Sequence, residues 1–265
     1  MRWKAMAVAV VCGGCAIAAA PVATAQQTAT VYVVHGVPDT PVDVYVDGQR
    51  AIDDFQPGST QGPLQLPAGP HKVALFAATA PDGSGAPVLQ ADANAPAGAN
   101  LTIVAHLNAQ EAPTITPFVN DVGPVPAGQA RLVVRHTAAA PAVDVRVGGK
   151  PVIQGLTNPQ QKELQVPAGT VSADVTLAGT GTVAIGPAEL DLAEGTATFV
   201  HAIGSAAKQN LRVVPITITG LHSAPSGVPA GTGTPAGALP WLLLAVTGVG
   251  VLAAGRRFTG RPAAG

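Results

Sequence analysis

Hydrophobic and polar residues alternate with a period of two along the middle of this chain. In the stretch 42–47, valines at the even positions alternate with Asp43, Tyr45 and Asp47. The stretches 101–107 and 171–177 alternate in the same way. Because successive side chains of a β-strand point to opposite faces, this pattern predicts half-buried strands and an all-β fold.

Turn signals separate these predicted strands. Asp47-Gly48 and Gly148-Gly149 are each typical of a tight hairpin turn. Pro-Ala-Gly occurs at 67–69 and again at 167–169, where glycine is free to adopt a positive φ. The spacing of such signals predicts six or seven short strands in each half of the chain.

The two halves are copies of one repeat. The stretch 31–35 recurs as 132–136, with His136 in the place of His35, an offset of 101 residues. Leu-Gln-Leu-Pro-Ala-Gly at 64–69 recurs as Leu-Gln-Val-Pro-Ala-Gly at 164–169, an offset of 100. The change in offset predicts a one-residue deletion in the second copy.

Residues 26–120 and 121–219 are therefore predicted to be tandem domains. Short alternating strands separated by turns favour two Ig-like antiparallel β-sandwich domains. The many glycines and prolines, 31 and 25 residues, argue against a helical bundle.

The first 25 residues have the features of a signal peptide. A basic start and an apolar run (5–20) precede Ala23-Thr24-Ala25, which fits the cleavage rule. The alternative, lipidation of Cys15, lacks the aliphatic residue expected three positions earlier. Because Cys12 and Cys15 are the chain's two cysteines, the mature protein is predicted to have no disulfide, thiolate nucleophile or cysteine metal site.

The other end predicts a membrane anchor. An uncharged apolar run, 236–255, has the length of a transmembrane helix and is followed by a basic tail, 256–265. The positive-inside rule places this tail in the cytoplasm and the two domains outside the cell, as in a type I single-pass protein of the cell membrane. Residues 220–235, rich in Pro, Gly and Ser, are expected to form a stalk. A sortase substrate would need a Leu-Pro-x-Thr-Gly box, which Leu239-Pro240-Trp241 does not supply.

One motif resembles a known family. The run 35–48, His-Gly-Val-Pro-Asp-Thr-Pro-Val-Asp-Val-Tyr-Val-Asp-Gly, followed by Leu-Pro-Ala-Gly at 66–69, is similar to the repeat of the bacterial secreted family called domain of unknown function 4397. The second copy departs from it at 138–140 and at Arg146. The resemblance implies an exported, cell-surface β-sandwich repeat and no particular reaction.

Composition and charge restrict the function classes. The chain is 47% hydrophobic, 3% aromatic and 11% charged, with a formal net charge of −1. Binding of nucleic acid requires a basic surface, so we expect no nucleic-acid partner. The abundance of Ala, Gly and Pro is typical of GC-rich genomes, such as those of actinobacteria.

The charges are unevenly divided. Residues 26–120 carry two basic side chains against eight acidic ones, whereas residues 121–219 are balanced. Asp39, Asp43 and Asp47 lie on or near one strand, where their oxygens could gather around a hard cation such as Ca²⁺. The alternative is a solvated strand face, and no metal or cofactor is predicted because no calcium-loop pattern is present.

Histidines occupy equivalent positions in the two copies. His35 and His136 each follow a predicted strand, and the favoured interpretation is that the ring binds a backbone carbonyl and fixes the turn. His106 and His201, in the predicted closing strands, could approach them. No His-Glu-x-x-His spacing indicates a zinc site.

No catalytic motif accompanies these residues. The sequence has no Gly-x-Ser-x-Gly, and Gly83-Ser84-Gly85 lacks the lysine of a phosphate-binding loop. We therefore predict an exported, membrane-anchored, non-enzymatic module that binds an extracellular or envelope protein. The alternatives are a metal or small-ligand carrier that uses the acidic face of the first repeat with His35, and, less favoured, a hydrolase of envelope polymers.

Overall fold

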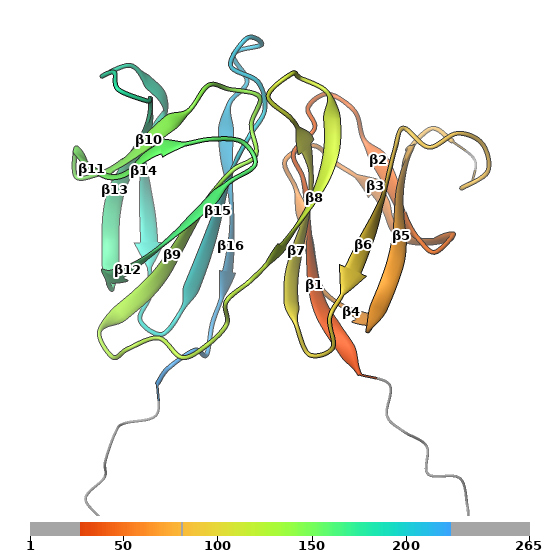
Figure 1. Cartoon of the computed structure of the whole chain (residues 1–265), viewed down its shortest axis with the longest axis horizontal. Helices are drawn as coiled ribbons and strands as arrows, with labels where there is room; N and C mark the ends of the chain where they lie inside the picture. Colours follow the sequence, from red (N-terminus) through yellow and green to blue (C-terminus); the bar gives the residue numbers. More distant parts are fainter. Residues whose placement is uncertain (1–26, 81, 224–265) are drawn as a thin grey trace, which may run out of the picture. The chain divides into compact units, whose positions relative to one another are not determined.

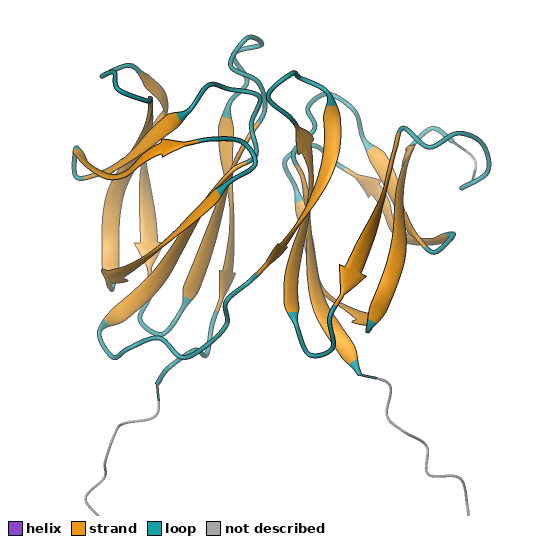
Figure 2. Ribbon diagram, viewed as in Figure 1, coloured by secondary structure: helices purple, strands orange, loops and turns teal. Residues whose placement is uncertain are grey.

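The structure is a computed structural model that describes residues 27–80 and 82–223. Every regular element in these residues is a β-strand, as Figure 2 shows, so the predicted all-β class is confirmed. The described part has no helix long and apolar enough to cross a membrane. The predicted signal peptide, the stalk after residue 223, the transmembrane helix and the basic tail lie outside the described residues.

The first repeat forms a sandwich of two four-stranded sheets (Figure 1). One sheet has the strand order β4-β1-β7-β8 and the other β3-β2-β5-β6. The strands are β1 (Thr28–His35), β2 (Val42–Val46), β3 (Gln49–Phe55), β4 (Thr60–Pro67), β5 (Gly69–Ala77), β6 (Leu89–Ala95), β7 (Asn100–Leu107) and β8 (Pro113–Val119).

The second repeat has the same arrangement. Its sheets have the orders β12-β9-β15-β16 and β11-β10-β13-β14. The strands are β9 (Gln129–His136), β10 (Val143–Val147), β11 (Lys150–Leu156), β12 (Gln161–Pro167), β13 (Gly169–Leu177), β14 (Val183–Leu192), β15 (Ala197–Ile203) and β16 (Arg212–Ile218). Each repeat thus has eight strands, where six or seven were predicted.

The predicted antiparallel pairing is wrong for one pair in each sandwich. β1 and β7 run parallel, and so do β9 and β15. Between β1 and β7 the chain passes through the other sheet, and it can then return beside β1 in the same direction. The alternation of apolar residues determines which face of a strand is buried but not its direction, so the pattern could not predict this pairing.

The one-residue deletion corresponds to a β-bulge. On β4, Leu64 pairs with Val31 and Gln61 with Val33, so β4 has one extra residue opposite β1. The equivalent strand β12 pairs with β9 without a register shift. At the bulge, a side chain on Gly62 would come within 2.9 Å of Tyr32, which explains why glycine is needed there.

The predicted turns are confirmed. Asp47 and Gly48 have φ values of 51° and 81°, and Gly148 and Gly149 have 56° and 75°, which are the left-handed conformations of a two-residue hairpin. The glycine of each Pro-Ala-Gly also has a positive φ.

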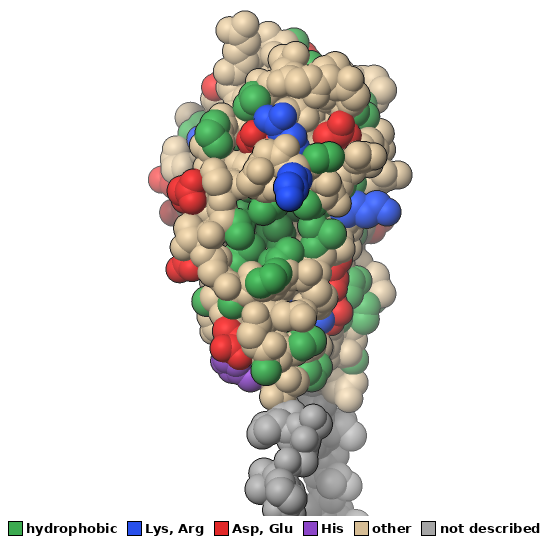
Figure 3. All heavy atoms as spheres, turned by 90° about the vertical axis from the view of Figure 1, so that its left-hand side faces the viewer, with side chains coloured by type: hydrophobic (Ala, Val, Ile, Leu, Met, Phe, Trp, Pro, Cys, Tyr) green, Lys and Arg blue, Asp and Glu red, His purple; other side chains and the backbone are tan. Residues whose placement is uncertain are grey.

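The cores are built mainly from small aliphatic side chains. The core cluster of the first sandwich contains one aromatic residue, Phe55, and that of the second contains none. Some apolar side chains stay exposed: Figure 3 shows hydrophobic side chains gathered in the middle of one face. Both sandwiches belong to one compact unit that ends at Ala224, and all the core clusters lie within it. Residues 26–223 therefore hold a complete core of their own.

Candidate functional site

The predicted acidic face of β2 is largely covered. Asp43 is 2% exposed and Tyr45 6%, although the pattern predicted a solvated face. The loop that follows β5 covers Tyr45: Ala80 packs against the cluster of Tyr45 and Phe76, and Gly83 lies directly against the Tyr45 ring. An alternating strand shows which residues share a face, but not whether a distant loop covers that face.

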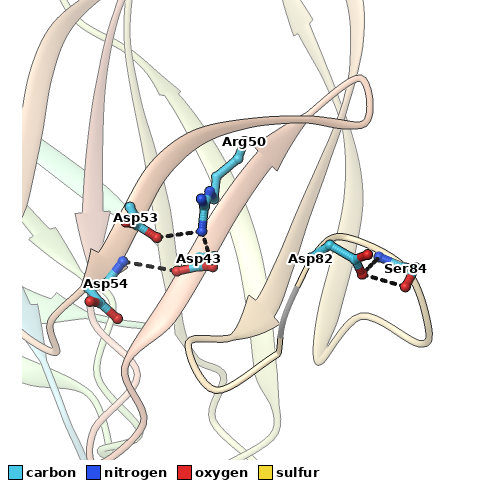
Figure 4. A network of polar contacts seen from close by, with 6 residues as sticks. All are labelled: Asp43, Arg50, Asp53, Asp54, Asp82 and Ser84. Atoms are coloured by element: carbon cyan, nitrogen blue, oxygen red, sulfur yellow. Dashed lines mark hydrogen bonds and ion pairs between the residues drawn. The ribbon is translucent and has the colours of Figure 1, made fainter.

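The carboxylate of Asp43 is held by internal donors (Figure 4). It accepts hydrogen bonds from the backbone N–H of Asp54 at 2.9 Å and from Arg50 Nη1 at 3.3 Å. The same nitrogen of Arg50 donates to Asp53 at 2.7 Å. Both oxygens of Asp43 therefore already accept hydrogen bonds from the protein.

The second repeat uses its equivalent aspartate in the same way. Asp144 accepts from the backbone N–H groups of Gly155 at 2.8 Å and Gly179 at 2.9 Å, and these bonds lower its pKa. Asp54 and Gly155 both have left-handed φ values, 47° and 64°. The aspartate of the Val-Asp-Val motif thus satisfies the N–H group of a left-handed residue in both copies, which is a structural role.

The other two aspartates lie elsewhere. Asp47 accepts from the backbone N–H of Lys72 at 2.8 Å and pairs with His71 Nδ1 at 2.6 Å. The Lys72 N–H first, and then His71, lower the pKa of Asp47. Burial of His71 opposes its charged form, but its bonds to Asp47 and to the carbonyl of Pro67 outweigh this and raise its pKa.

Asp39 lies in a loop that lines a different hollow. The structure therefore does not gather Asp39, Asp43 and Asp47 around one point. Among residues 27–80 and 82–223, no three His, Cys, Asp or Glu side chains are placed to hold a metal ion.

The structural interpretation of the repeated histidines is confirmed. His35 Nε2 lies 2.8 Å from the carbonyl oxygen of Thr40, and His136 Nε2 lies 3.0 Å from that of Pro141. A carbonyl oxygen only accepts, so Nε2 carries the proton in both rings. Burial lowers the pKa of both histidines, which keeps them neutral.

Of the remaining histidines, His106 and His201 lie where β7 and β15 face the other sandwich. His106 contacts Thr116 and the carbonyl of Leu107, and burial followed by the nearby His136 lowers its pKa. Among the described residues, no hydrogen bond joins His106 to His35 or His136. His201 instead contacts Arg135.

Arg135 is a fully buried arginine at the junction of the two repeats. Its guanidinium lies between the rings of Phe118 and Phe199, with its carbon 4.6 Å and 4.8 Å from their centroids. Its nitrogens contact Asn120 at 2.7 Å, Gln161 at 2.9 Å and His201 Nε2 at 3.1 Å. Because Phe118 and Asn120 come from the first repeat, Arg135 joins the two sandwiches.

This arginine has neutral partners. His201 Nδ1 donates to the carbonyl of Val214 at 3.0 Å, so Nε2 is free to accept from Arg135. Burial and then the charge of Arg135 lower the pKa of His201 to about 3. Burial lowers the pKa of Arg135 to about 9, and in the described part of the chain no carboxylate pairs with it.

An apolar layer surrounds this arginine. It combines residues of both repeats: Val34, Val104, Phe118, Val133, Ala197, Phe199, Ile203, Val214 and Ile216. The pair Val34 and Val104 of the first repeat corresponds in register to Arg135 and His201 of the second. The sequence did contain a signal for this junction: the second copy has Arg135 at the repeat position where the first copy has Val34.

Two glycines of the first repeat allow the second repeat to approach closely. A side chain on Gly36 would come within 2.9 Å of Ile203, and one on Gly58 would collide with the guanidinium of Arg212. Further polar contacts cross the junction: Ser205 donates to Glu111, and the Asn158 amide donates to the carbonyl of Leu107 at 2.8 Å.

The connection between the repeats is held in place as well. Arg131 Nη1 donates to the backbone carbonyl of Asp121 at 2.9 Å and to that of Gly123 at 3.1 Å. The segment that joins the two sandwiches is therefore anchored by a side chain of β9.

A polar cleft of about 320 Å³ opens where loops of both repeats meet. Its charged residues are Asp39 from the first repeat and Arg212 from the second. Arg212 takes part in no ion pair among the described residues. Clefts between packed units are common binding sites, so this cleft is the candidate site for a partner.

Replacing Asp43 tests its structural role. Asp43→Ala is expected to lower the free energy of unfolding by about 1–3 kcal/mol, because Asp54 N–H and Arg50 lose their acceptor. Asp53→Ala is the control, since Asp53 is an exposed partner of the same arginine. This substitution should lower the free energy of unfolding by less than about 1 kcal/mol. Equal losses, or a rise in Tm with Ca²⁺ that Asp43→Ala abolishes, would contradict this role.

The buried histidines predict a loss of stability in acid. Burial lowers the folded-state pKa of His35, His106, His136 and His201, so the unfolded chain binds more protons below about pH 6.5. The free energy of unfolding should therefore fall from pH 7 to pH 4.5, partly opposed by His71. His201→Gln should reduce the slope by up to about 1.4 kcal/mol per pH unit. The exposed His222 provides the control, His222→Gln. The free energy of unfolding is measured by denaturant titration at each pH. If it changes equally with pH in the wild type and both variants, the assignment is refuted.

The chain has a match to a protein-family model and a distant similarity to a solved structure. No curated protein matches the chain. A solved structure described as a "putative cell adhesion protein" from Bacteroides ovatus ATCC 8483 is similar at 8% identity and a TM-score of 0.24, covering 76% of this chain and 100% of that one. The sequence model of the family described as Domain of unknown function (DUF4397) matches residues 29–146, which run from β1 to β10. Over these residues the chain matches the DUF4397 family, so the resemblance predicted from the motif at 35–48 is confirmed.

Proposed function

We propose that this chain is an exported protein, anchored by a C-terminal transmembrane helix, whose two Ig-like sandwiches act outside the cell as one rigid, non-enzymatic binding module. Support for the location comes from the two ends of the sequence: the segment 1–25 has the features of a signal peptide, and the uncharged run 236–255 precedes arginines. The proposed partner is an extracellular or envelope protein.

The observation that carries this proposal is the buried junction around Arg135. Tandem domains on a flexible linker would present two independent surfaces. Here Arg135 binds Asn120 and the ring of Phe118 across the junction, and a shared apolar layer encloses the contact. A junction of this kind makes loops of both repeats into a single surface with a fixed shape, which favours recognition of one partner.

The burial of four histidines and one serine supports a non-enzymatic role. Catalysis uses a nucleophile or base that can reach a substrate. The histidines His35, His106, His136 and His201 are each at most 1% exposed and bind internal groups. Ser205, which pairs with Glu111, is also fully buried.

The inter-repeat cleft is the proposed partner site. Asp39 and Arg212 give it one charge of each sign. Opposite charges on either side of a cleft select a partner segment with a complementary pair of charges.

Membrane anchoring is tested by fractionating cells that express either the full chain or a chain that ends at residue 223. The full chain should sediment with the membranes and be digested by protease added to intact cells, whereas the shorter chain should be released. Recovery of both chains from the cytoplasm would refute the proposed export.

Partner recognition is tested with residues 26–223 carrying a fluorescent label. Arg212→Glu should weaken binding of this protein to intact cells that lack their own copy, by about tenfold, which corresponds to about 1.4 kcal/mol. Lys150→Glu, which makes the same charge change on the exposed β10–β11 hairpin, is the control. Equal binding by both variants would exclude the cleft as the partner site.

A further inference from the structure

The first sandwich contains an apolar cavity between its two sheets. The cavity has a volume of about 210 Å³ and lies at the edge where β3 and β4 run. Its walls come from both sheets and include Val31, Val44, Ile52, Leu64 and Ile103, and Gln65 is the one polar residue in its lining.

The cavity follows from the small side chains of this core. Protein interiors normally leave few voids larger than a water molecule. Here aliphatic side chains such as Val31, Val44 and Ile52 line the space between the two sheets, and they do not fill it to this edge. A dry apolar cavity of about 150 Å³ is enough to bind benzene, so a larger one has room for an aliphatic group.

A polar hollow lies beside the cavity. It has a volume of about 370 Å³ and shares Val46, Ala51 and Leu66 with the cavity lining. Its other residues include Asp47, Arg50 and His71. Ala51 is exposed and Leu66 half-buried, so the shared wall is at the surface. Apolar and polar compartments thus adjoin one another, which is the arrangement that an amphiphile requires.

Arg50 and Gln49 offer donors in the polar hollow. Arg50 is hydrogen-bonded to Asp43 and Asp53 through Nη1 alone, and its side chain is 46% exposed. Nε and Nη2 of Arg50, and the amide of Gln49, have no hydrogen bond among the described residues. These groups are available for the oxygen atoms of a ligand.

The charges around the hollow favour an uncharged head group. Asp43 and Asp53 already balance the charge of Arg50, and Asp47 pairs with His71. The first repeat as a whole is strongly acidic. An anionic head group would therefore be repelled, whereas hydroxyl groups can accept from Arg50 and exchange hydrogen bonds with Gln49.

We propose that the first sandwich binds an amphiphile with a single aliphatic chain and an uncharged, hydroxyl-bearing head group, the chain in the cavity and the head in the hollow. This site is separate from the inter-repeat cleft, and it does not depend on the partner proposed there. Binding would bring a lipid-like molecule to the module without any covalent step.

Isothermal titration calorimetry of residues 26–223 with monoacylglycerols below their micelle concentration tests this site. One molecule should bind per protein, and affinity should rise about fourfold for each CH₂ that enters the cavity. Glycerol alone should not bind, and decanoate should bind at least tenfold more weakly than monodecanoylglycerol. No binding of any chain length would overturn the site, and equal binding of decanoate would overturn the head-group assignment.

Two variants distinguish this cavity from a general apolar surface. Ala51→Trp places a large ring at the shared wall and should weaken binding of monodecanoylglycerol at least tenfold. Val152→Trp makes the change at the equivalent exposed position of the second repeat and should leave binding within twofold. Equal losses would overturn the proposal. Circular dichroism and Tm of both variants show whether each is folded before binding is compared.

Arg50→Ala separates the head group from the chain. This substitution should weaken the binding of monodecanoylglycerol several-fold and leave the dependence of affinity on chain length unchanged. A changed chain-length dependence would contradict the placement of the head beside Arg50. Because these measurements use purified protein and a defined probe, their failure leaves the cell-binding test of the proposed function unaffected.

Discussion

The buried guanidinium of Arg135 is the constraint on which the arrangement of the two repeats depends. Removing a charge from water is costly, and here the compensation comes from two aromatic faces, two amide oxygens and a neutral imidazole instead of a carboxylate. These partners satisfy the charge only in one relative position of the repeats, because Asn120 and Phe118 belong to the first and His201 to the second. The apolar layer supplies most of the attraction, and the arginine makes one register preferable to the others.

The repeat explains why such a junction could be built on an unchanged fold. The hairpin turns, the Val-Asp-Val aspartate and the carbonyl-binding histidine have the same structural roles in both copies. One pair of differences lies on the faces that meet. Val34 and Val104 of the first copy correspond to Arg135 and His201 of the second. The first copy thus presents an apolar surface, whereas the second presents a polar centre that needs to be enclosed. The two faces are therefore complementary. Because they differ, neither sandwich can pair with a second copy of itself in the same way.

Sequence reasoning predicted what local chemistry determines. The period of two, the Asp-Gly and Gly-Gly turns and the change of offset predicted the strands, the hairpins and the one-residue deletion, because each depends on a few neighbouring residues. The parallel pairing of β1 with β7, the cover over Tyr45 and the contacts of Arg135 join residues far apart in the chain. No local pattern carries that information. The acidic cluster shows the consequence, because Asp39, Asp43 and Asp47 are close in sequence but lie in different environments. Asp43 binds Arg50 and the N–H of Asp54, Asp47 binds His71 and the N–H of Lys72, and Asp39 lines the inter-repeat cleft.

Several of the few aromatic residues lie beside buried polar groups, and the rest of the space between the sheets is filled by aliphatic side chains. Phe118 and Phe199 enclose Arg135, the Phe55 ring lies 5.5 Å from the ring of His35, and Phe76 pairs with Asp43 across β5 and β2. Aromatic rings thus cover buried polar groups, which need large, polarisable neighbours. The space between the sheets is left to valine, alanine and leucine. In the first sandwich this aliphatic packing leaves an apolar cavity of about 210 Å³ at the edge of the core, whereas the cavity lined by Leu132 and Val145 in the second sandwich is about 40 Å³.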